Sequence, residues 1–179
     1  LLGKKLMPAK NEACTATITS IKDVDSDHFE AQAVDSAGNE LRTYRNLTYK
    51  DMSELNADPQ VSEIYVEGDI PFVTADDMSL ILVDTPGPNN ARTEEHKKTT
   101  YNMLGKSSKT LVMYVMNATQ QSTTDDARLL KDVSESMKVG GKQSRDRFIF
   151  VLNKVDSFTQ GEDNVEESII KIKEYLKEY

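Results

Sequence analysis

Four residues suited to phosphate chemistry follow an apolar run near the middle of the chain. The run, Leu80–Val83, leads directly into Asp84, Thr85, Pro86 and Gly87. An acidic residue at the carboxyl end of a buried strand lies where α/β sheets bind their ligands, and a glycine allows its backbone N–H to approach a phosphate oxygen closely. This segment therefore predicts contact with a phosphorylated ligand.

A second polar segment follows another apolar run, Phe148–Leu152, and contains Asn153, Lys154 and Asp156. An asparagine amide can both donate to and accept from a purine edge. A carboxylate can accept two N–H bonds, from N1 and the exocyclic amine of guanine. Because adenine lacks this pair of donors, Asp156 predicts selectivity for guanine.

Together, the two segments resemble the DxxG and NKxD motifs of P-loop GTPases, each in the structural context that its motif requires. Further stretches resemble the GTPase domain of the dynamin superfamily, particularly of bacterial dynamin-like proteins. These stretches are Leu1–Pro8, Glu12–Ile18, Asp84–Asn89 and Met116–Gln120. The resemblance covers nearly the whole chain, although no motif stands out between residues 22 and 75.

The resemblance implies roles for the residues that match the family's motifs. Thr15 falls at the switch I threonine, which ligates Mg²⁺ and helps to hold the attacking water. Thr17 and Thr19 are close competitors, because all three threonines share one face of a strand with a period of two. Asp84 would reach Mg²⁺ through a water molecule.

The other matching residues would contact the nucleotide. Gly87 would offer its N–H to the γ-phosphate, with Thr85 and Pro86 completing that segment. Asn153 and Asp156 would read guanine, and the stem of Lys154 would lie along the base.

The family's phosphate-binding loop, of pattern G-x-x-x-x-G-K-[S/T], is not found in its expected context. Gly105–Ser107 looks similar, but Thr100 occupies the position of the first glycine and the segment precedes a strand. By resemblance, the true loop would lie upstream of residue 1, and a last base-contacting loop would lie beyond Tyr179. We therefore expect GTP hydrolysis from the full-length parent and none from this segment alone.

The expected fold is α/β, a three-layer P-loop GTPase (G domain) type with a mostly parallel sheet, incomplete at the N-terminus and at the C-terminus. The whole of 1–179 is expected to be one partial domain. Apolar runs at 80–83, 111–116 and 148–152 predict strands buried on both faces of a parallel sheet. In such folds, the strand that leads into the phosphate loop lies between the first two of these runs, which would otherwise expose unpaired backbone.

Other elements are predicted from local patterns. Helices are expected from Asp125 to Met137 and over Val165–Tyr179, where apolar residues recur at spacings of three and four. Short antiparallel or edge strands are expected at Thr15–Ile21, Phe29–Val34, Leu41–Tyr44 and Ile64–Val66, with a turn at Ser36–Gly38 and a short helix over Thr48–Leu55.

Composition excludes several functional classes. The chain of 179 residues has 22 basic and 30 acidic residues, a formal net charge of −8, so duplex nucleic acid is not an expected partner. A single cysteine, Cys14, fits a reducing cytoplasmic setting, and no apolar run is long enough to span a bilayer. His28 and His96 are expected to be exposed side chains and not metal ligands.

The resemblance implies GTP and GDP as ligands, Mg²⁺ as cofactor and self-association through the GTPase domain. It also implies membrane remodelling through regions outside this chain, at a cytoplasmic location that could be peripheral to the inner membrane. Two alternatives are open: a non-catalytic interaction module that retains the GTPase fold, and another class of P-loop GTPase. A functional phosphate loop upstream would favour the enzyme over the module.

Overall fold

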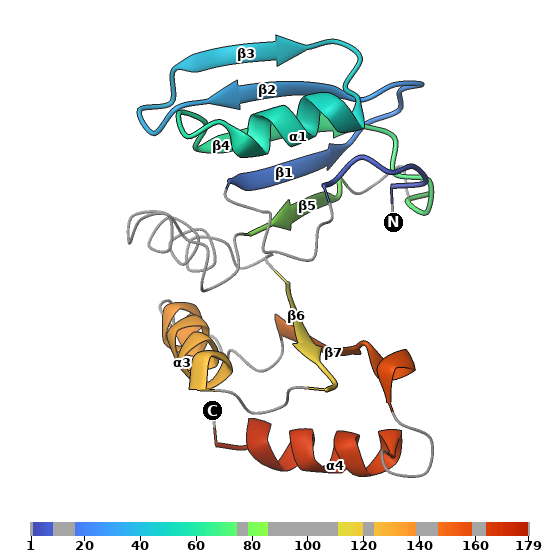
Figure 1. The fold of residues 1–179 in the computed structure, drawn as a ribbon, viewed down its shortest axis with the longest axis vertical. Helices are drawn as coiled ribbons and strands as arrows, with labels where there is room; N and C mark the ends of the chain where they lie inside the picture. The colour runs from blue at the N-terminus through green and yellow to red at the C-terminus, as the bar shows by residue number, and fades with distance from the viewer. Residues whose placement is uncertain are drawn as a thin grey trace. The chain divides into compact units, whose positions relative to one another are not determined.

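The structure, a computed structural model, describes residues 2–8, 17–74, 79–85, 111–119, 124–138, 147–158 and 164–178. The chain divides into two compact units, Leu1–Lys97 and Lys98–Tyr179. Each unit combines strands with helical structure (Figure 1). No helix in the described ranges is long and apolar enough to cross a membrane.

The first unit contains a five-stranded mixed sheet in the order β3-β2-β4-β1-β5. The central strands β1 and β4 are parallel, and the other three pairings are antiparallel. The strands are β1 (Ile18–Asp23), β2 (Glu30–Val34), β3 (Glu40–Tyr44), β4 (Glu63–Gly68) and β5 (Ile81–Asp84). The four short strands expected in the first half of the chain are present. The expectation that they are antiparallel or edge strands is wrong for the pairing of β1 with β4, which is parallel and lies inside the sheet.

The hairpin between β2 and β3 has the predicted turn. Gly38 adopts a φ of 83°, which glycine tolerates without a steric penalty. The carboxylate of Asp35 accepts hydrogen bonds from the backbone N–H of Ala37 at 2.9 Å and of Asn39 at 2.8 Å. The turn is therefore closed by a side chain that mimics a backbone acceptor.

The predicted short helix is α1 (Tyr49–Ala57), and it lies across one face of the five-stranded sheet (Figure 1). Thr48 and Asp51 form a capping box in which each side chain accepts from the other residue's backbone N–H. The helix buries Met52 and Leu55 in the core of the unit. This core also contains Ile21, Ala31, Ala33, Ile64 and Val66 from the strands.

The expected burial of β5 on both faces is wrong. Leu82 packs partly against the core, but Ile81 is 54% exposed and Val83 is 42% exposed. The strand pairs antiparallel with β1 at the edge of the described sheet, so it alternates like a strand covered on one face. A run of only four apolar residues cannot reveal how many layers cover it.

The second unit contains a parallel strand pair, β6 (Val112–Asn117) and β7 (Phe148–Asn153). The helix α3 (Thr124–Lys138) follows β6, and the short 3₁₀ helix η2 (Val155–Ser157) and the helix α4 (Val165–Leu176) follow β7. The predicted alternation of strand and helix is confirmed in this half of the chain.

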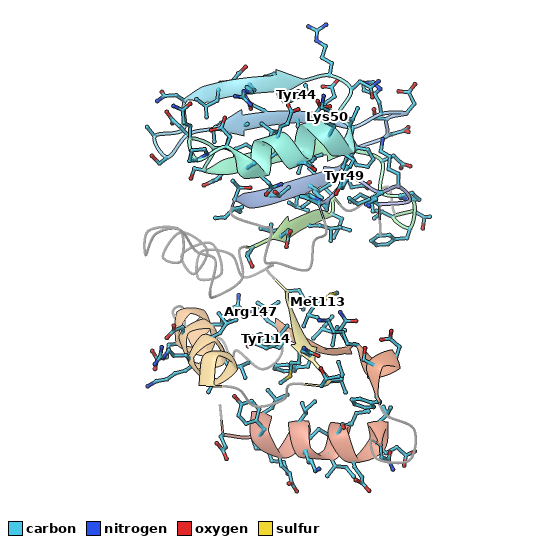
Figure 2. All side chains as sticks on the ribbon, in the orientation of Figure 1. Tyr44, Tyr49, Lys50, Met113, Tyr114 and Arg147 are labelled. Carbon is cyan, nitrogen blue, oxygen red and sulfur yellow. The ribbon has the colours of Figure 1, made fainter. Side chains whose placement is uncertain are left out.

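One face of β6 is buried and the other is exposed. Tyr114 and Met116 pack with Leu130 of α3 and Ile172 of α4. Met113, the residue before Tyr114 in β6, is 59% exposed. Figure 2 labels the two residues on opposite sides of the strand. The expected burial on both faces is therefore also wrong for β6. In β7, the neighbouring side chains of Ile149 and Phe150 project to opposite faces and both are exposed, so the expected burial on both faces is wrong for β7 as well.

Candidate functional site

Asp84 is the last residue of β5 and is exposed, with Thr85 directly after it. The carboxylate therefore lies at a strand end, as the sequence predicts. Pro86 and Gly87 lie outside the described residues. In the antiparallel pairing of β1 and β5, the residue directly opposite Asp84 is Thr19.

The three candidate threonines have different surroundings. Thr15 lies outside the described residues. Thr17 is fully buried, and its hydroxyl donates to Oδ1 of Asn56 in α1 at 2.9 Å. Asn56 in turn donates to the carbonyl oxygen of Met52 at 3.0 Å. Thr17 therefore has a structural role, because it ties the segment directly before β1 to α1.

Thr19 is also fully buried, with an exposed fraction of 0%. Unlike that of Thr17, its hydroxyl oxygen has no hydrogen-bond partner among the described residues. Buried polar side-chain atoms are paired in the great majority of cases, so this one requires an explanation.

The loop after β7 has an unusual backbone at Lys154. Its φ of 63° and ψ of 29° are left-handed, and it is the one described residue other than glycine with a positive φ. The left-handed region costs a residue with a side chain about 1–2 kcal/mol. The Lys154 N–H donates to Oδ1 of Asn153 at 2.9 Å, which holds the Asn153 amide against its own loop.

Asp156 follows in the 3₁₀ helix η2 and is exposed. The helix is closed by the Ser157 N–H, which donates to the carbonyl oxygen of Lys154 at 3.0 Å. The left-handed turn and the 3₁₀ helix together fix the backbone between Asn153 and Asp156. The asparagine amide and the aspartate carboxylate that the sequence predicts for base recognition are thus carried by one short, hydrogen-bonded loop.

The end of β6 supports this loop, a feature to which the sequence analysis assigned no role. Asn117 is the register partner of Asn153, and the Ala118 N–H donates to the carbonyl oxygen of Asn153 at 2.9 Å. The amide oxygen of Asn117 accepts from the N–H of Thr119 at 3.1 Å and from its hydroxyl at 2.9 Å. The signal was a polar residue directly after an apolar strand, the same signal that identified Asn153.

The residues on the phosphate side fit a magnesium ion by their chemistry. Mg²⁺ takes oxygen ligands and is usually held by one or two carboxylates, with water and substrate phosphates completing its shell. Asp84 supplies a carboxylate at an exposed strand end, with a threonine hydroxyl opposite it in the pairing. No group of three or more His, Cys, Asp or Glu side chains suited to a metal is found in the described part of the chain.

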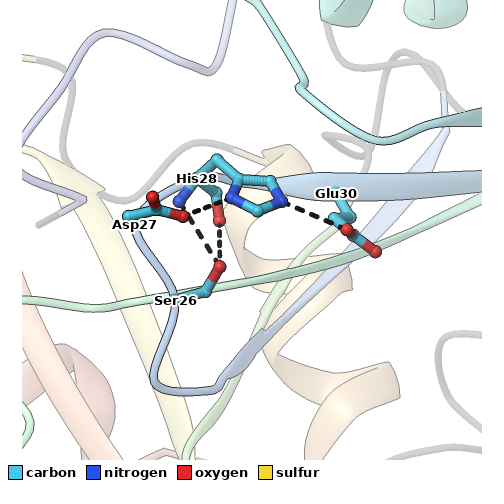
Figure 3. A network of polar contacts seen from close by, with 4 residues as sticks. All are labelled: Ser26, Asp27, His28 and Glu30. Atoms are coloured by element: carbon cyan, nitrogen blue, oxygen red, sulfur yellow. Dashed lines mark hydrogen bonds and ion pairs between the residues drawn. The ribbon is translucent and has the colours of Figure 1, made fainter.

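A separate polar network surrounds His28 in the segment before β2 (Figure 3). The imidazole contacts the Asp27 carboxylate through Nδ1 and the Glu30 carboxylate through Nε2, at 3.2 Å for the latter. The hydroxyl of Ser26 donates to the His28 carbonyl oxygen at 2.9 Å. Hydrogen bonds to Asp27 and then to Glu30 raise the pKa of His28 above its ordinary value. Cys14 and His96 lie outside the described residues, as does Gly105–Ser107.

Comparison with known proteins identifies a matching family and a similar solved structure. The sequence profile of the Dynamin family matches residues 1–155. A solved structure of an oligomerised bacterial dynamin pair, described as providing a mechanism for the long-range sensing and tethering of membranes, is similar with a TM-score of 0.69 and 18% sequence identity. The match covers 99% of this chain and 28% of that chain, so the present chain spans little more than a quarter of that relative. No curated protein sequence matches significantly.

The likeness in structure confirms the expected fold class, an α/β fold of the P-loop GTPase type found in dynamin G domains. The sheet of the first unit is more mixed than expected, because three of its four pairings are antiparallel. The family profile covers well over half of the sequence, including the segments of Asp84, Asn153 and Lys154. The chain therefore belongs to the dynamin family.

Proposed function

We propose that this chain is the guanine-nucleotide-binding part of a dynamin-like GTPase, and that the full-length protein hydrolyses GTP. The observation that supports this most strongly is the loop after β7. There, Lys154 adopts a left-handed conformation, and its backbone N–H donates to Oδ1 of Asn153. Uncommon backbone conformations at residues other than glycine persist where the surrounding structure enforces them, and they cluster at ligand-binding sites.

Base selection follows from the donors and acceptors of this loop. The Asp156 carboxylate accepts from N1–H and from the exocyclic amine of guanine, and adenine offers no such pair. The Asn153 amide oxygen is engaged by the Lys154 N–H, so its NH₂ group is directed to the ligand as a donor. The aliphatic stem of Lys154 covers one face of the base.

On the phosphate side, the chain supplies Asp84, Thr85, Pro86 and Gly87 at the end of β5, and Thr15 from the segment before β1. The Gly87 N–H donates to the γ-phosphate, and Thr15 orients the attacking water. When bound, Mg²⁺ would neutralise negative charge on the phosphates. The Asp84 carboxylate orients a water molecule in the shell of that ion.

We further propose that the two compact units belong to one GTPase domain and that the full-length protein self-associates through it. The similar bacterial dynamin pair is described as oligomerised and as tethering membranes. By analogy, the parent remodels membranes through regions outside this chain. A cytoplasmic location, peripheral at the inner membrane, is the matching proposal.

The test is nucleotide turnover by purified full-length protein. With Mg²⁺ present, GTP should be hydrolysed and ATP should not. The Asp84→Ala variant should lose at least about 100-fold in kcat, because a group that orients the metal shell acts mainly in the transition state. Hydrolysis of ATP at a rate equal to that of GTP would refute the role of Asp156. Guanine-nucleotide binding without turnover would favour the non-catalytic interaction module.

A further inference from the structure

The proposed function assigns no role to the buried hydroxyl of Thr19. The residue is fully buried, and Oγ1 has no partner among the described residues. Thr17, two positions earlier and directly before β1, is equally buried but donates to Asn56. A hydroxyl that is buried without a hydrogen bond is unfavourable. A valine would fill the same volume without that cost.

The neighbours of Thr19 on this face of the sheet limit what its hydroxyl can bind. Two positions away along the chain are Thr17, which lies directly before β1 and already donates its hydroxyl to Asn56, and Ile21 in β1. In β4, the register partner is Ile64. In β5, the register partner is Asp84. Both isoleucines lack polar side-chain atoms, so among these strand neighbours Asp84 is the one whose side chain can accept a hydrogen bond.

The pairing also places Thr19 and Asp84 on the same face. Residues directly opposite in an antiparallel pair project to the same side, with Cβ atoms about 4.5–5.5 Å apart. Leu82, two residues before Asp84, is the register partner of Ile21 and packs with it in the core. Because side chains alternate along a strand, Asp84 shares the face of Leu82 and of Thr19.

We propose that Thr19 is a positioning residue for Asp84. In the nucleotide-bound protein, its hydroxyl donates to one carboxylate oxygen of Asp84 and leaves the other oxygen directed to the metal shell. This inference rests on the proposed function. A group that donates a hydrogen bond to a carboxylate at a metal site fixes the orientation of that carboxylate. Loss of such a group typically weakens metal binding by about 10–100-fold.

The test compares Thr19→Val, which removes the hydroxyl at nearly constant volume, with Thr19→Ser, which keeps it. Thr17→Val is the matched control, since it removes an equally buried hydroxyl two positions away, directly before β1. Full-length protein bound to GDP is titrated with Mn²⁺, and free Mn²⁺ is followed by electron paramagnetic resonance. The Mg²⁺ concentration for half-maximal GTP turnover and the Tm without nucleotide are measured in parallel.

Thr19→Val should weaken Mn²⁺ binding about 10-fold or more, and Thr19→Ser should stay within about 3-fold of wild type. Without nucleotide, Thr19→Val should melt no lower than wild type, since its hydroxyl makes no bond to lose. Thr17→Val should melt lower, because it leaves the Asn56 amide oxygen without its donor, and should bind Mn²⁺ normally. A merely structural threonine would not lose metal affinity while keeping stability.

Wild-type Mn²⁺ affinity in Thr19→Val would overturn the inference while leaving the proposed function intact. Equal losses of metal affinity in Thr19→Val and Thr17→Val would also overturn it, because the effect would then be a general one on β1. If the wild-type protein binds no guanine nucleotide, the proposed function itself fails. Should Thr19→Val not fold, a 10-fold loss of affinity in Thr19→Ser would equally contradict the proposal.

Discussion

Lys154 shows how a single residue in the loop proposed to bind the base combines conformational cost with function. Its left-handed backbone is one that glycine adopts freely and lysine does not. We predict that Lys154→Gly raises the free energy of unfolding by about 1 kcal/mol by relieving that strain. The same change should weaken GTP binding, because the stem over the base is removed.

Urea unfolding and a GTP titration of the full-length protein check both effects. Lys131→Gly is the matched control, since Lys131 is an exposed residue inside α3, where glycine should destabilise by about 1 kcal/mol. If Lys154→Gly lowers stability as Lys131→Gly does, the left-handed turn is not a source of strain.

His28 gives the first unit a pH-dependent contribution to stability. Its pKa is raised in the folded chain, chiefly by the hydrogen bond to Asp27 and then by the one to Glu30. The stabilisation is therefore complete below the unfolded pKa of about 6.5 and is lost as the pH rises through the higher folded-state pKa. Thermal unfolding of wild type and His28→Gln should differ more at about pH 5.5 than at about pH 8.5.

The carboxylate partners provide the control for this prediction. Glu30→Gln keeps the size of the side chain and removes its charge, so it should reduce the pH-dependent difference without abolishing it. A gap between wild type and His28→Gln that is the same at both pH values would show that the network adds no pH-dependent stability.

At the scale of elements, the end of β4 depends on the absence of a side chain at Gly68. A Cβ atom at this position would overlap the ring of Phe29, which is itself buried. We predict that Gly68→Ala destabilises the protein by about 1–3 kcal/mol, as overpacking in a core typically does. Chemical denaturation of the full-length protein measures the change.

A double mutant isolates the cause. Phe29→Leu removes the ring atoms that the new methyl group would meet, so Gly68→Ala should cost clearly less in that background than in wild type. Additive losses in the double mutant would mean that the glycine is required for another reason.

The sequence predicts elements better than it predicts their burial. The α1 helix was located because its capping residues, Thr48 and Asp51, are local signals, and the strands were located by their β-branched and apolar runs. The burial of β5 and β6 was predicted wrongly. How many layers cover a strand depends on residues distant in sequence, so Ile81 and Met113 carry no local mark of their exposure.

In the candidate site, too, local features could be predicted from the sequence, whereas contacts between distant residues could not. Asp84 and Asn153 were identified because a polar residue directly after an apolar run can be recognised from the sequence alone. The difference between Thr17 and Thr19 was not visible, because it rests on Asn56, which is 39 positions away from Thr17, and on the register with β5. The left-handed Lys154 also has no sequence signal, since lysine is not a residue that favours this conformation.

At the scale of the whole molecule, the proposed function assigns the segment that ends β5 and the segment that follows β7 to one guanine nucleotide. Asp156 is proposed to read the base, and Asp84 is proposed to serve the phosphates. A substitution at Asp156 should therefore change which base is used, whereas a substitution at Asp84 should stop turnover whatever the base.

The most direct measurement is kcat/KM for GTP and for xanthosine triphosphate in Asp156→Asn full-length protein, alone and combined with Asp84→Ala. Xanthine has an oxygen where guanine has its amine, so an asparagine amide at 156 can donate to it. We predict a loss of at least about 100-fold for GTP, a gain for the xanthine nucleotide, and loss of that gained activity in the double variant. Unchanged preference for GTP in Asp156→Asn, or xanthine-nucleotide turnover that survives Asp84→Ala, would contradict the account.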